Sequence, residues 1–175
     1  RVYVSSSNLP LFPGLQYGEL HAHSRYTDDQ VEFGAPIQVM RAFSRALELK
    51  FVGVTDHSYE FSPSRYPDTQ RNPWQKFQDE VQNMNSEPDH PEDPLILPGE
   101  EISCGNQDNR NVHLLLFNNP SLVVGDGDGA VRWLCTVPDQ SAAAILHSSG
   151  DQFFAAAAHP AVRPSVLERV LLRRG

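Results

Sequence analysis

The sequence has few cysteines, no long apolar run and a shortage of basic residues, and each of these absences excludes a class of protein. Its two cysteines, Cys104 and Cys135, are too few for a disulfide framework and form no CxxC pair, so two reduced thiols are the simplest interpretation. No window approaches the ~18–20 consecutive apolar residues of a membrane-spanning helix. No signal peptide is recognisable. We therefore expect a cytoplasmic protein with no membrane partner.

Acidic residues outnumber basic ones, with 22 Asp and Glu against 14 Lys and Arg and a formal net charge of -8. This balance argues against a broad basic surface, so a long nucleic acid is a disfavoured partner, although it is not excluded. The 175 residues fit one domain with a sizeable core. We expect a single domain over residues 1–175, of which residues 1–14 form a polar, proline-broken lead-in.

The first half of the chain alternates between strand and helix patterns. Residues 15–23 and 51–57 are apolar and extended in character, and apolar positions recur at helical spacing over residues 35–50. Strand, helix and strand in this order predict a βαβ unit and hence a parallel sheet or barrel. Residues 58–94, rich in Pro, Asp, Asn and Gln, are expected to form an insertion or lid-like loop, with a helix at residues 74–84.

The second half continues with further strand patterns. "LILPGEEIS" at residues 95–103 and "NVHLLLF" at residues 111–117 predict two strands with a turn between them. Residues 130–149 favour a helix, which Pro138 interrupts. "FFAAAAHP" at residues 153–160 predicts a buried strand, and Pro164 opens a closing helix with a basic C-terminal end.

Histidines and acids gather at the predicted strands. His21 and His23 are two residues apart, so on a strand both imidazoles project from the same face. Asp28 and Asp29 follow in a loop that can return an oxygen to that face. Imidazole and carboxylate together are the ligand set of Zn, Fe or Mn. A lone H-x-H pair also occurs in proteins that bind no metal, so the prediction depends on further histidines converging with these two.

Such residues do recur along the chain. His57 follows Asp56 at the end of a predicted strand, and Glu100 and Glu101 end the next apolar run. In parallel α/β architectures the carboxyl ends of strands line the active site. The sequence therefore predicts a metal cluster assembled from several strands, in which five of the seven histidines take part: His21, His23, His57, His113 and His159.

These motifs resemble those of the PHP family, named for its polymerase and histidinol-phosphatase members. "ELHAHSRYTD" at residues 19–28 is similar to the family's first motif, D-L-H-x-H-[ST]-x-x-S-D, with Glu19 and Thr27 as departures. The resemblance implies that His21, His23 and Asp28 are metal ligands, and not Asp29.

The later motifs follow in the family's order over residues 18–160. T-D-H at residues 55–57 implies His57 as a ligand and Asp56 as the residue that orients an imidazole. G-x-E implies Glu101, which in the family bridges two metals. His113 and the His159 of "AHP" complete the implied ligand set.

The resemblance implies an α/β fold, a distorted (β/α)7 barrel of the PHP type. The family's late D-x-H motif, which supplies two more ligands, is not found after His159. We therefore expect the barrel to be incomplete at its C-terminus. A fragment of a longer chain is the favoured interpretation, and a naturally shortened form is the alternative.

The implied activity is metal-dependent hydrolysis of phosphate esters. Two or three divalent ions (Zn, Mn or Fe) would activate a bridging hydroxide for in-line attack on phosphorus. Arg25 and Asp56 are the expected catalytic residues. Arg25 would clamp the phosphate through its planar fork, although an exposed loop arginine is an equally good interpretation. Asp56 would orient a histidine ligand.

Several functions remain open from the sequence. A small phosphorylated metabolite or nucleotide is the favoured substrate, cleaved either as a monoester or as a diester. A non-catalytic PHP-like module that binds a metal or a partner is one alternative. A 3'-5' exonuclease-type nuclease is another. The metal and the oligomeric state are left open too.

Overall fold

A computed structural model describes residues 12–28, 32–62, 72–129, 135–148 and 153–175 of the chain. Most of the lead-in expected at residues 1–14 lies outside these ranges. Of the helix expected at residues 130–149, the described residues 142–148 are helical and residues 135–141 are not. Residues 130–134 and 149 lie outside the described part.

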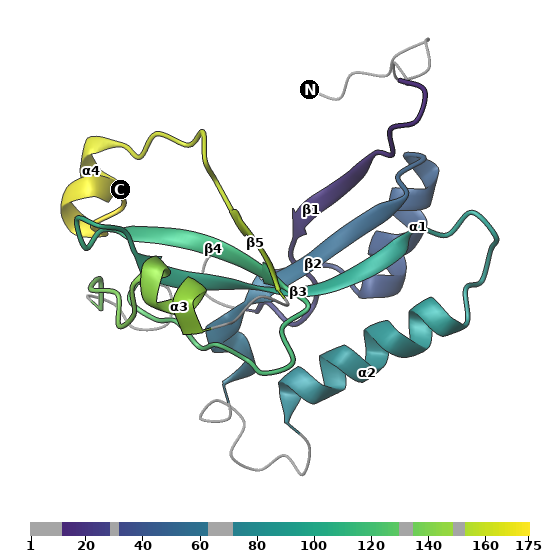
Figure 1. The fold of residues 1–175 in the computed structure, drawn as a ribbon, viewed down its shortest axis with the longest axis horizontal. Helices are drawn as coiled ribbons and strands as arrows, with labels where there is room; N and C mark the ends of the chain where they lie inside the picture. Colours follow the sequence, from purple (N-terminus) through teal and green to yellow (C-terminus); the bar gives the residue numbers. More distant parts are fainter. Residues whose placement is uncertain (1–11, 29–31, 63–71, 130–134, 149–152) are drawn as a thin grey trace.

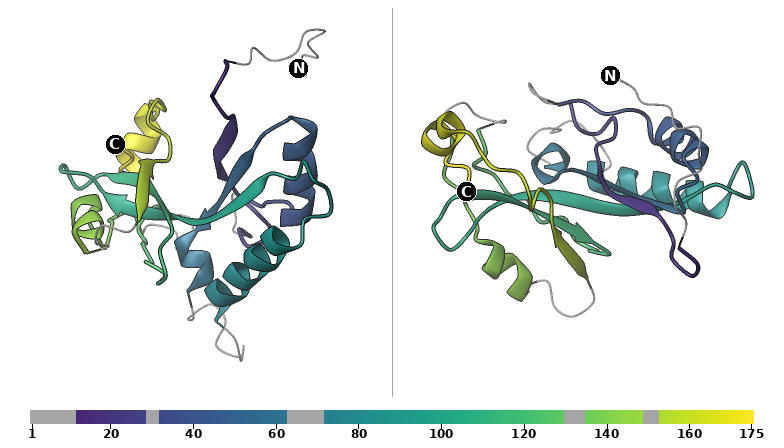
Figure 2. Two further views of the ribbon diagram at one scale, coloured as in Figure 1. Left: turned by 45° about the vertical axis from the view of Figure 1, so that its right-hand side comes forward. Right: turned by 90° about the horizontal axis from the view of Figure 1, so that it is seen from above.

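Five strands form one mixed sheet in the order β1-β2-β3-β4-β5. The first three run parallel, and β4 and β5 are each antiparallel to the strand before them. Figures 1 and 2 show a curled, open sheet, with α1 and α2 beside the β1–β3 half and α3 and α4 near the β4–β5 half. The strands are β1 (Gly18–Ala22), β2 (Phe51–His57), β3 (Leu95–Gly105), β4 (Asn111–Phe117) and β5 (Phe154–Ala157).

The expected (β/α)7 barrel is wrong. In the described residues, five strands and four α-helices form a half-barrel whose edge strands β1 and β5 do not pair. The parallel pattern ends at β3 because only residues 106–110 connect it to β4. A parallel neighbour needs a crossover of a dozen or more residues, whereas a short turn returns the chain antiparallel.

Helices α1 (Ile37–Ala46) and α2 (Pro73–Ser86) form the core with the parallel half of the sheet. The side chain of Asn72 caps α2 by accepting from the backbone N–H of Trp74, and Pro73 occupies the first turn, where its missing N–H has no cost. The predicted helix at residues 74–84 is confirmed. Its buried face packs with residues of α1, β2, β3 and the short 3₁₀-helix η1 (Ser58–Phe61), and the cluster includes Ile37, Val52, Val54, Phe61, Trp74, Phe77, Val81, Met84 and Ile96.

A second apolar cluster lies under the antiparallel half of the sheet. There α3 (Ala142–Ser148) packs Ile145 against Ile102, Leu114 and Leu116. Successive side chains of a strand point to opposite faces. The even-numbered residues of β2, β3 and β4 therefore face the two cores, and the odd-numbered ones face the other side of the sheet.

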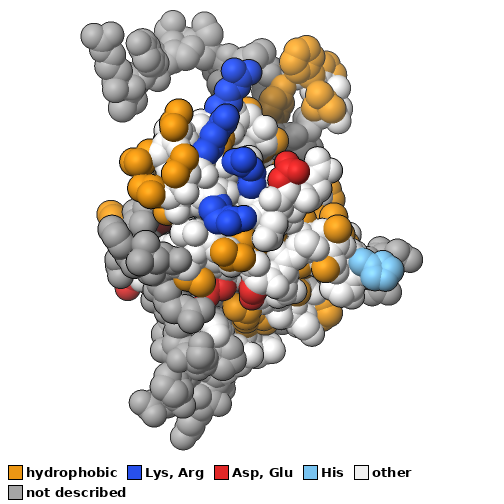
Figure 3. All heavy atoms as spheres, turned by 90° about the vertical axis from the view of Figure 1, so that its left-hand side faces the viewer, with side chains coloured by type: hydrophobic (Ala, Val, Ile, Leu, Met, Phe, Trp, Pro, Cys, Tyr) orange, Lys and Arg blue, Asp and Glu red, His pale blue; other side chains and the backbone are white. Residues whose placement is uncertain are grey.

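The C-terminal helix α4 (Val166–Leu171) starts with a capping box between Ser165 and Glu168. Figure 3 shows the face on its side of the molecule, where apolar and basic side chains lie together on the surface. The exposed apolar residues of α4 are Val166, Leu167, Val170 and Leu171, and Val162 is exposed just before the helix. Among the described helices, none has the length and hydropathy to cross a membrane.

Glu100 is a buried carboxyl on the core face of β3. It accepts hydrogen bonds from Asn119 Nδ2 at 2.9 Å and from the backbone N–H of Val123 at 3.2 Å. Burial raises the pKa of Glu100 to about 8, and these two hydrogen bonds only partly oppose the shift. Because this pKa lies above the ordinary value of 4.5, the folded protein retains a proton that the unfolded chain releases. The free energy of unfolding should therefore fall as the pH rises between these two values.

Replacing Glu100 with Gln should remove this pH dependence while keeping an acceptor for Asn119. Relative to the wild type, Glu100→Gln should gain stability by a few kcal/mol between about pH 5 and about pH 8, since one pKa unit corresponds to about 1.4 kcal/mol. Chemical denaturation at both pH values, with a chelator present, measures the difference. Glu92→Gln, at an exposed position, is the control and should show no such gain. Parallel pH profiles for wild type and Glu100→Gln would contradict the assignment.

Candidate metal centre

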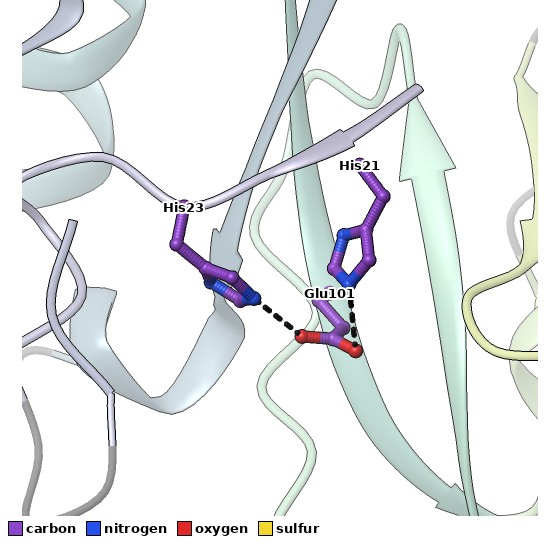
Figure 4. Close-up of side chains that lie close together, drawn as sticks. All are labelled: His21, His23 and Glu101. Atoms are coloured by element: carbon purple, nitrogen blue, oxygen red, sulfur yellow. Dashed lines mark ion pairs between the residues drawn. The ribbon is translucent and has the colours of Figure 1, made fainter. Parts of the chain in front are cut away.

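The face of the sheet opposite the cores carries five imidazoles around one carboxylate. All six residues are odd-numbered and lie in a strand or within two residues of its end. His57 on β2 lies directly opposite Glu101 on β3. Leu115 on β4 is the cross-strand partner of Glu101, so His113 is a diagonal neighbour on the same face. His21 and His23 approach from β1 and the residues after it, and both point at the Glu101 carboxylate in Figure 4.

The two oxygens of Glu101 face two separate sets of histidines. Oε1 lies 2.7 Å from His113 Nδ1, 3.1 Å from His159 Nε2 and 3.4 Å from His21 Nε2. Oε2 lies 3.1 Å from His57 Nδ1 and 3.4 Å from His23 Nε2. The carboxylate thus stands between an Oε1 side and an Oε2 side of the cluster.

The charges of the cluster depend on the contacts between the Glu101 carboxylate and the imidazoles. Burial alone would raise the pKa of Glu101, but hydrogen bonds from His113 and His159 hold it far below its usual range. Burial would likewise lower the pKa of His57, yet the neighbouring carboxylates of Glu101 and Glu32 raise it to about 10. For His23, burial and the nearby His57 lower the pKa. The centre therefore pairs an ionised carboxylate with at least one protonated imidazole.

Hydroxyl groups hold the outer nitrogens of the first two histidines. His21 Nδ1 lies 2.8 Å from Thr55 Oγ1, and His23 Nδ1 lies 3.1 Å from Thr27 Oγ1. The Nε2 atoms of both rings face Glu101. Such outer contacts fix the ring orientation of metal-binding histidines and increase their basicity.

Asp56 is buried behind this arrangement and anchors the loop after β1. Its carboxylate accepts from the backbone N–H and hydroxyl of Ser24, both at 2.6 Å, and from the same two groups of Thr27 at 3.2 and 2.8 Å. The hydroxyl of Thr27 links Asp56 to His23. This contact fits the role of orienting an imidazole.

Asp128 is a buried acid near the Oε1 side that sequence reasoning missed. Its Oδ2 lies 3.7 Å from His113 Nε2 and accepts a hydrogen bond from Ser103 Oγ at 2.8 Å. It belongs to the turn-rich stretch "GDGDG", which has no apolar residues at strand or helix spacing that could predict where its side chains point. Asp128 comes close to His113 only because that loop packs on β3 and β4.

Two predicted site residues lie apart from the cluster. Asp28 is exposed and does not belong to any of the described groups of converging metal-ligating atoms. Arg25 is half exposed, and its Nη2 atom lies 2.9 Å from Glu80 Oε2 on α2, where it lines a groove between α1 and α2. A second carboxylate, Glu32, which sequence reasoning missed, lies beside His23 and His57 at 3.3 and 3.5 Å.

The donor set suits a divalent transition-metal ion. Three groups have one ligand atom from each residue within 4.8 Å of the others: His21–His23–Glu101, His23–Glu32–His57 and Glu101–His113–His159. Buried Glu101 Oε2 accepts no hydrogen bond of good geometry, although two imidazole nitrogens lie close to it. Imidazoles with carboxylates are ligands for Zn, Mn and Fe.

No family model matches the chain, and no curated protein matches it.

Replacing Asp56 with Asn should weaken both the fold and the metal centre. An amide group presents one acceptor oxygen where the loop needs two, and an unsatisfied buried donor costs about 1–3 kcal/mol. Because the loop carries His23, the affinity for Zn²⁺ should also fall by roughly 10–100-fold. Denaturation and Zn²⁺ titration measure the two effects, with exposed Asp108→Asn as control. Lower stability with unchanged Zn²⁺ affinity would limit Asp56 to a structural role.

Zn²⁺ uptake should release protons. With a pKa of about 10, His57 is protonated in the metal-free protein at neutral pH, and an imidazole must lose its proton before it binds an ion. Calorimetric titrations in two buffers of different ionisation enthalpy should reveal about one proton or more released per chain. His57→Gln should release fewer, whereas exposed His147→Gln should match the wild type. Identical heats in both buffers would refute this.

Proposed function

We propose that the chain is a metal-dependent hydrolase of phosphate esters, acting on a small phosphorylated metabolite or nucleotide. The observation that carries this proposal is the position of Glu101, whose two oxygens face separate groups of imidazoles. A carboxylate placed in this way is suited to hold two divalent ions at adjacent positions. Metal pairs of this kind are a recurrent solution for phosphoryl chemistry.

The order of the motifs supports phosphate esters as the substrate class. H-x-H, T-D-H, G-x-E and "AHP" follow one another as they do in the PHP family. The net charge of -8 favours a small substrate over a long nucleic acid. We propose two or three ions of Zn, Mn or Fe as cofactors.

The protein's own groups would bind and orient the reacting partners. On the Oε1 side, His21, His113 and His159 would hold one ion, and on the Oε2 side His23 and His57 would hold the other. Divalent ions bound there would neutralise phosphate oxygens and lower the pKa of a bound water. Thr55 and Thr27 keep two of the rings in place, and no side-chain nucleophile is required.

Access to the centre supports the same proposal. The side chain of His159 is 47% exposed, whereas those of His57 and Glu101 are 6% and 0% exposed. The centre is therefore open on the side of His159 and closed behind Glu101. A phosphate group would enter past His159, because the buried Glu101 side offers no access from solvent.

Replacing Glu101 with Gln tests the proposal. The amide keeps the size of the side chain but removes the negative charge that the Oε1 and Oε2 sides share. Loss of a residue that only orients a metal ligand costs about 10–100-fold in metal affinity. Loss of Glu101 itself should therefore lower the metal affinity by more than about 100-fold. Metal content after dialysis and turnover of p-nitrophenyl phosphate and its bis-ester are the readouts. Glu100→Gln is the matched control, because it is the neighbouring buried glutamate on the other face of β3.

The outcomes separate the remaining functions. Loss of metal and turnover together in Glu101→Gln, with both kept in Glu100→Gln, supports the hydrolase. Preference for the mono- or the bis-ester distinguishes phosphatase from phosphodiesterase, and degradation of single-stranded DNA would favour a nuclease. A wild-type protein that binds metal but cleaves none of these would be a binding module, and turnover that survives metal loss would refute the scheme.

A further inference from the structure

A carboxylate outside the family motifs reaches the Oε2 side of the centre. Glu32 Oε2 lies 3.3 Å from His23 Nε2 and 3.5 Å from His57 Nε2. One ligand atom from each of the three residues lies within 4.8 Å of the other two. The motif resemblance instead assigns a ligand at Asp28, whose side chain is exposed and is not among these groups.

Backbone contacts hold the segment after Glu32 against the loop that carries His23. Phe33 bridges antiparallel to Asp28, and the N–H of Gly34 donates to the carbonyl oxygen of Thr27 at 3.3 Å. The N–H of Arg25 donates to the carbonyl oxygen of Ala35 at 2.9 Å. The position of Glu32 beside the histidines is thus set by contacts on its C-terminal side.

Gly34 makes this close approach possible. A Cβ atom at Gly34 would lie 2.2 Å from the carbonyl oxygen of His23 and 2.4 Å from that of Ser24. Real side chains do not tolerate such distances, so the backbone can pack here only with glycine. At Gly34, two residues after Glu32, the chain therefore packs directly against the backbone of His23, a predicted ligand.

The number of donors supports a role for Glu32. On the Oε1 side, Glu101 is joined by three imidazoles, whereas on the Oε2 side it is joined by only two. A protein site for zinc commonly uses three or four protein donors. Glu32 completes a converging set of three donors with His23 and His57, and it adds the negative charge that a divalent cation favours.

Glu32 reaches the centre from its solvent-exposed side. Its side chain is 49% exposed, in contrast to the fully buried Glu101. Glu32 therefore lies at the solvent side of the centre, where it can accommodate an ion without moving the core.

We propose that Glu32, and not Asp28, supplies the carboxylate that binds a divalent ion together with His23 and His57. This inference rests on the proposed metal centre and assigns one of its ligands. It gives the Oε2 side a site of two imidazoles and one carboxylate of its own beside Glu101. The Oε1 side keeps its own donors and does not depend on Glu32.

Metal titration of two matched variants tests the assignment. Glu32→Gln and Asp28→Asn each remove one carboxylate charge from the same loop. Co²⁺ and Zn²⁺ binding are followed by calorimetry and, for Co²⁺, by the visible absorption that reports its coordination. Glu32→Gln should lower the affinity for one of two ions by 10-fold or more and change the Co²⁺ spectrum. The affinity for the other ion should stay the same. Asp28→Asn should bind both ions as the wild type does.

Two further variants guard against a folding artefact. Thermal unfolding in the presence of a chelator should show that both variants fold, with Asp28→Asn equal to the wild type and Glu32→Gln slightly less stable because it loses the ion pair with His57. Glu32→Asp retains a carboxylate and should recover part of the lost affinity, whereas Glu32→Ala should not. A role limited to ion pairing with His57 would change chelator-treated stability and leave the Co²⁺ spectrum unchanged.

The results distinguish this assignment from the proposed function. If the wild type binds ions and Glu32→Gln binds them equally well, or if Asp28→Asn shows the loss instead, only the assignment of Glu32 fails. If the wild type binds no ion, the metal centre and the proposed hydrolase both fail. Since binding is measured without a substrate, an inactive protein that loses one ion in Glu32→Gln would still support the assignment.

Discussion

The contact between the buried Glu101 carboxylate and the surrounding imidazoles is the constraint on which the rest of the site depends. Removing an ionised carboxylate from water costs several kcal/mol unless charges and hydrogen bonds compensate for it. Here the compensation comes from five histidines on β1, β2, β4 and the segments that follow β1 and β5. Metal-free, these groups neutralise one another, and the same arrangement provides donors for cations.

Strand alternation explains how one sheet carries both an apolar core and this polar centre. Glu100 and Glu101 are neighbours in sequence and equally buried, yet the pKa values of their carboxyl groups are shifted in opposite directions. Glu100 points toward the core side of the sheet, where burial dominates and raises its pKa. Glu101 points toward the histidines, where hydrogen bonds dominate and lower it. Side-chain direction, more than burial itself, decides which of the two can serve as a ligand.

The predicted barrel is wrong, but the predicted histidines still converge. The motif resemblance predicts His113 on one strand of a (β/α)7 barrel, whereas it lies within an antiparallel strand. It nevertheless reaches Glu101, because cross-strand neighbours share a face in antiparallel as well as in parallel pairs. The short connection at residues 106–110 changes the direction of β4 without moving His113 off that face. The convergence thus depends on register and strand order rather than on the direction of β4.

The sequence alone determined the elements and the types of residue that take part. The extended run at residues 51–57, the helix at residues 74–84 and the i, i+2 spacing of His21 and His23 follow from local backbone geometry, which repeats every 2.0 or 3.6 residues. Only the tertiary structure decided which side chains meet across loops. It separated Asp28 and Arg25 from the cluster and brought Glu32 and Asp128 to it. Loops have no repeating geometry, so the position of a loop side chain depends on long-range packing, such as that of Gly34 against His23.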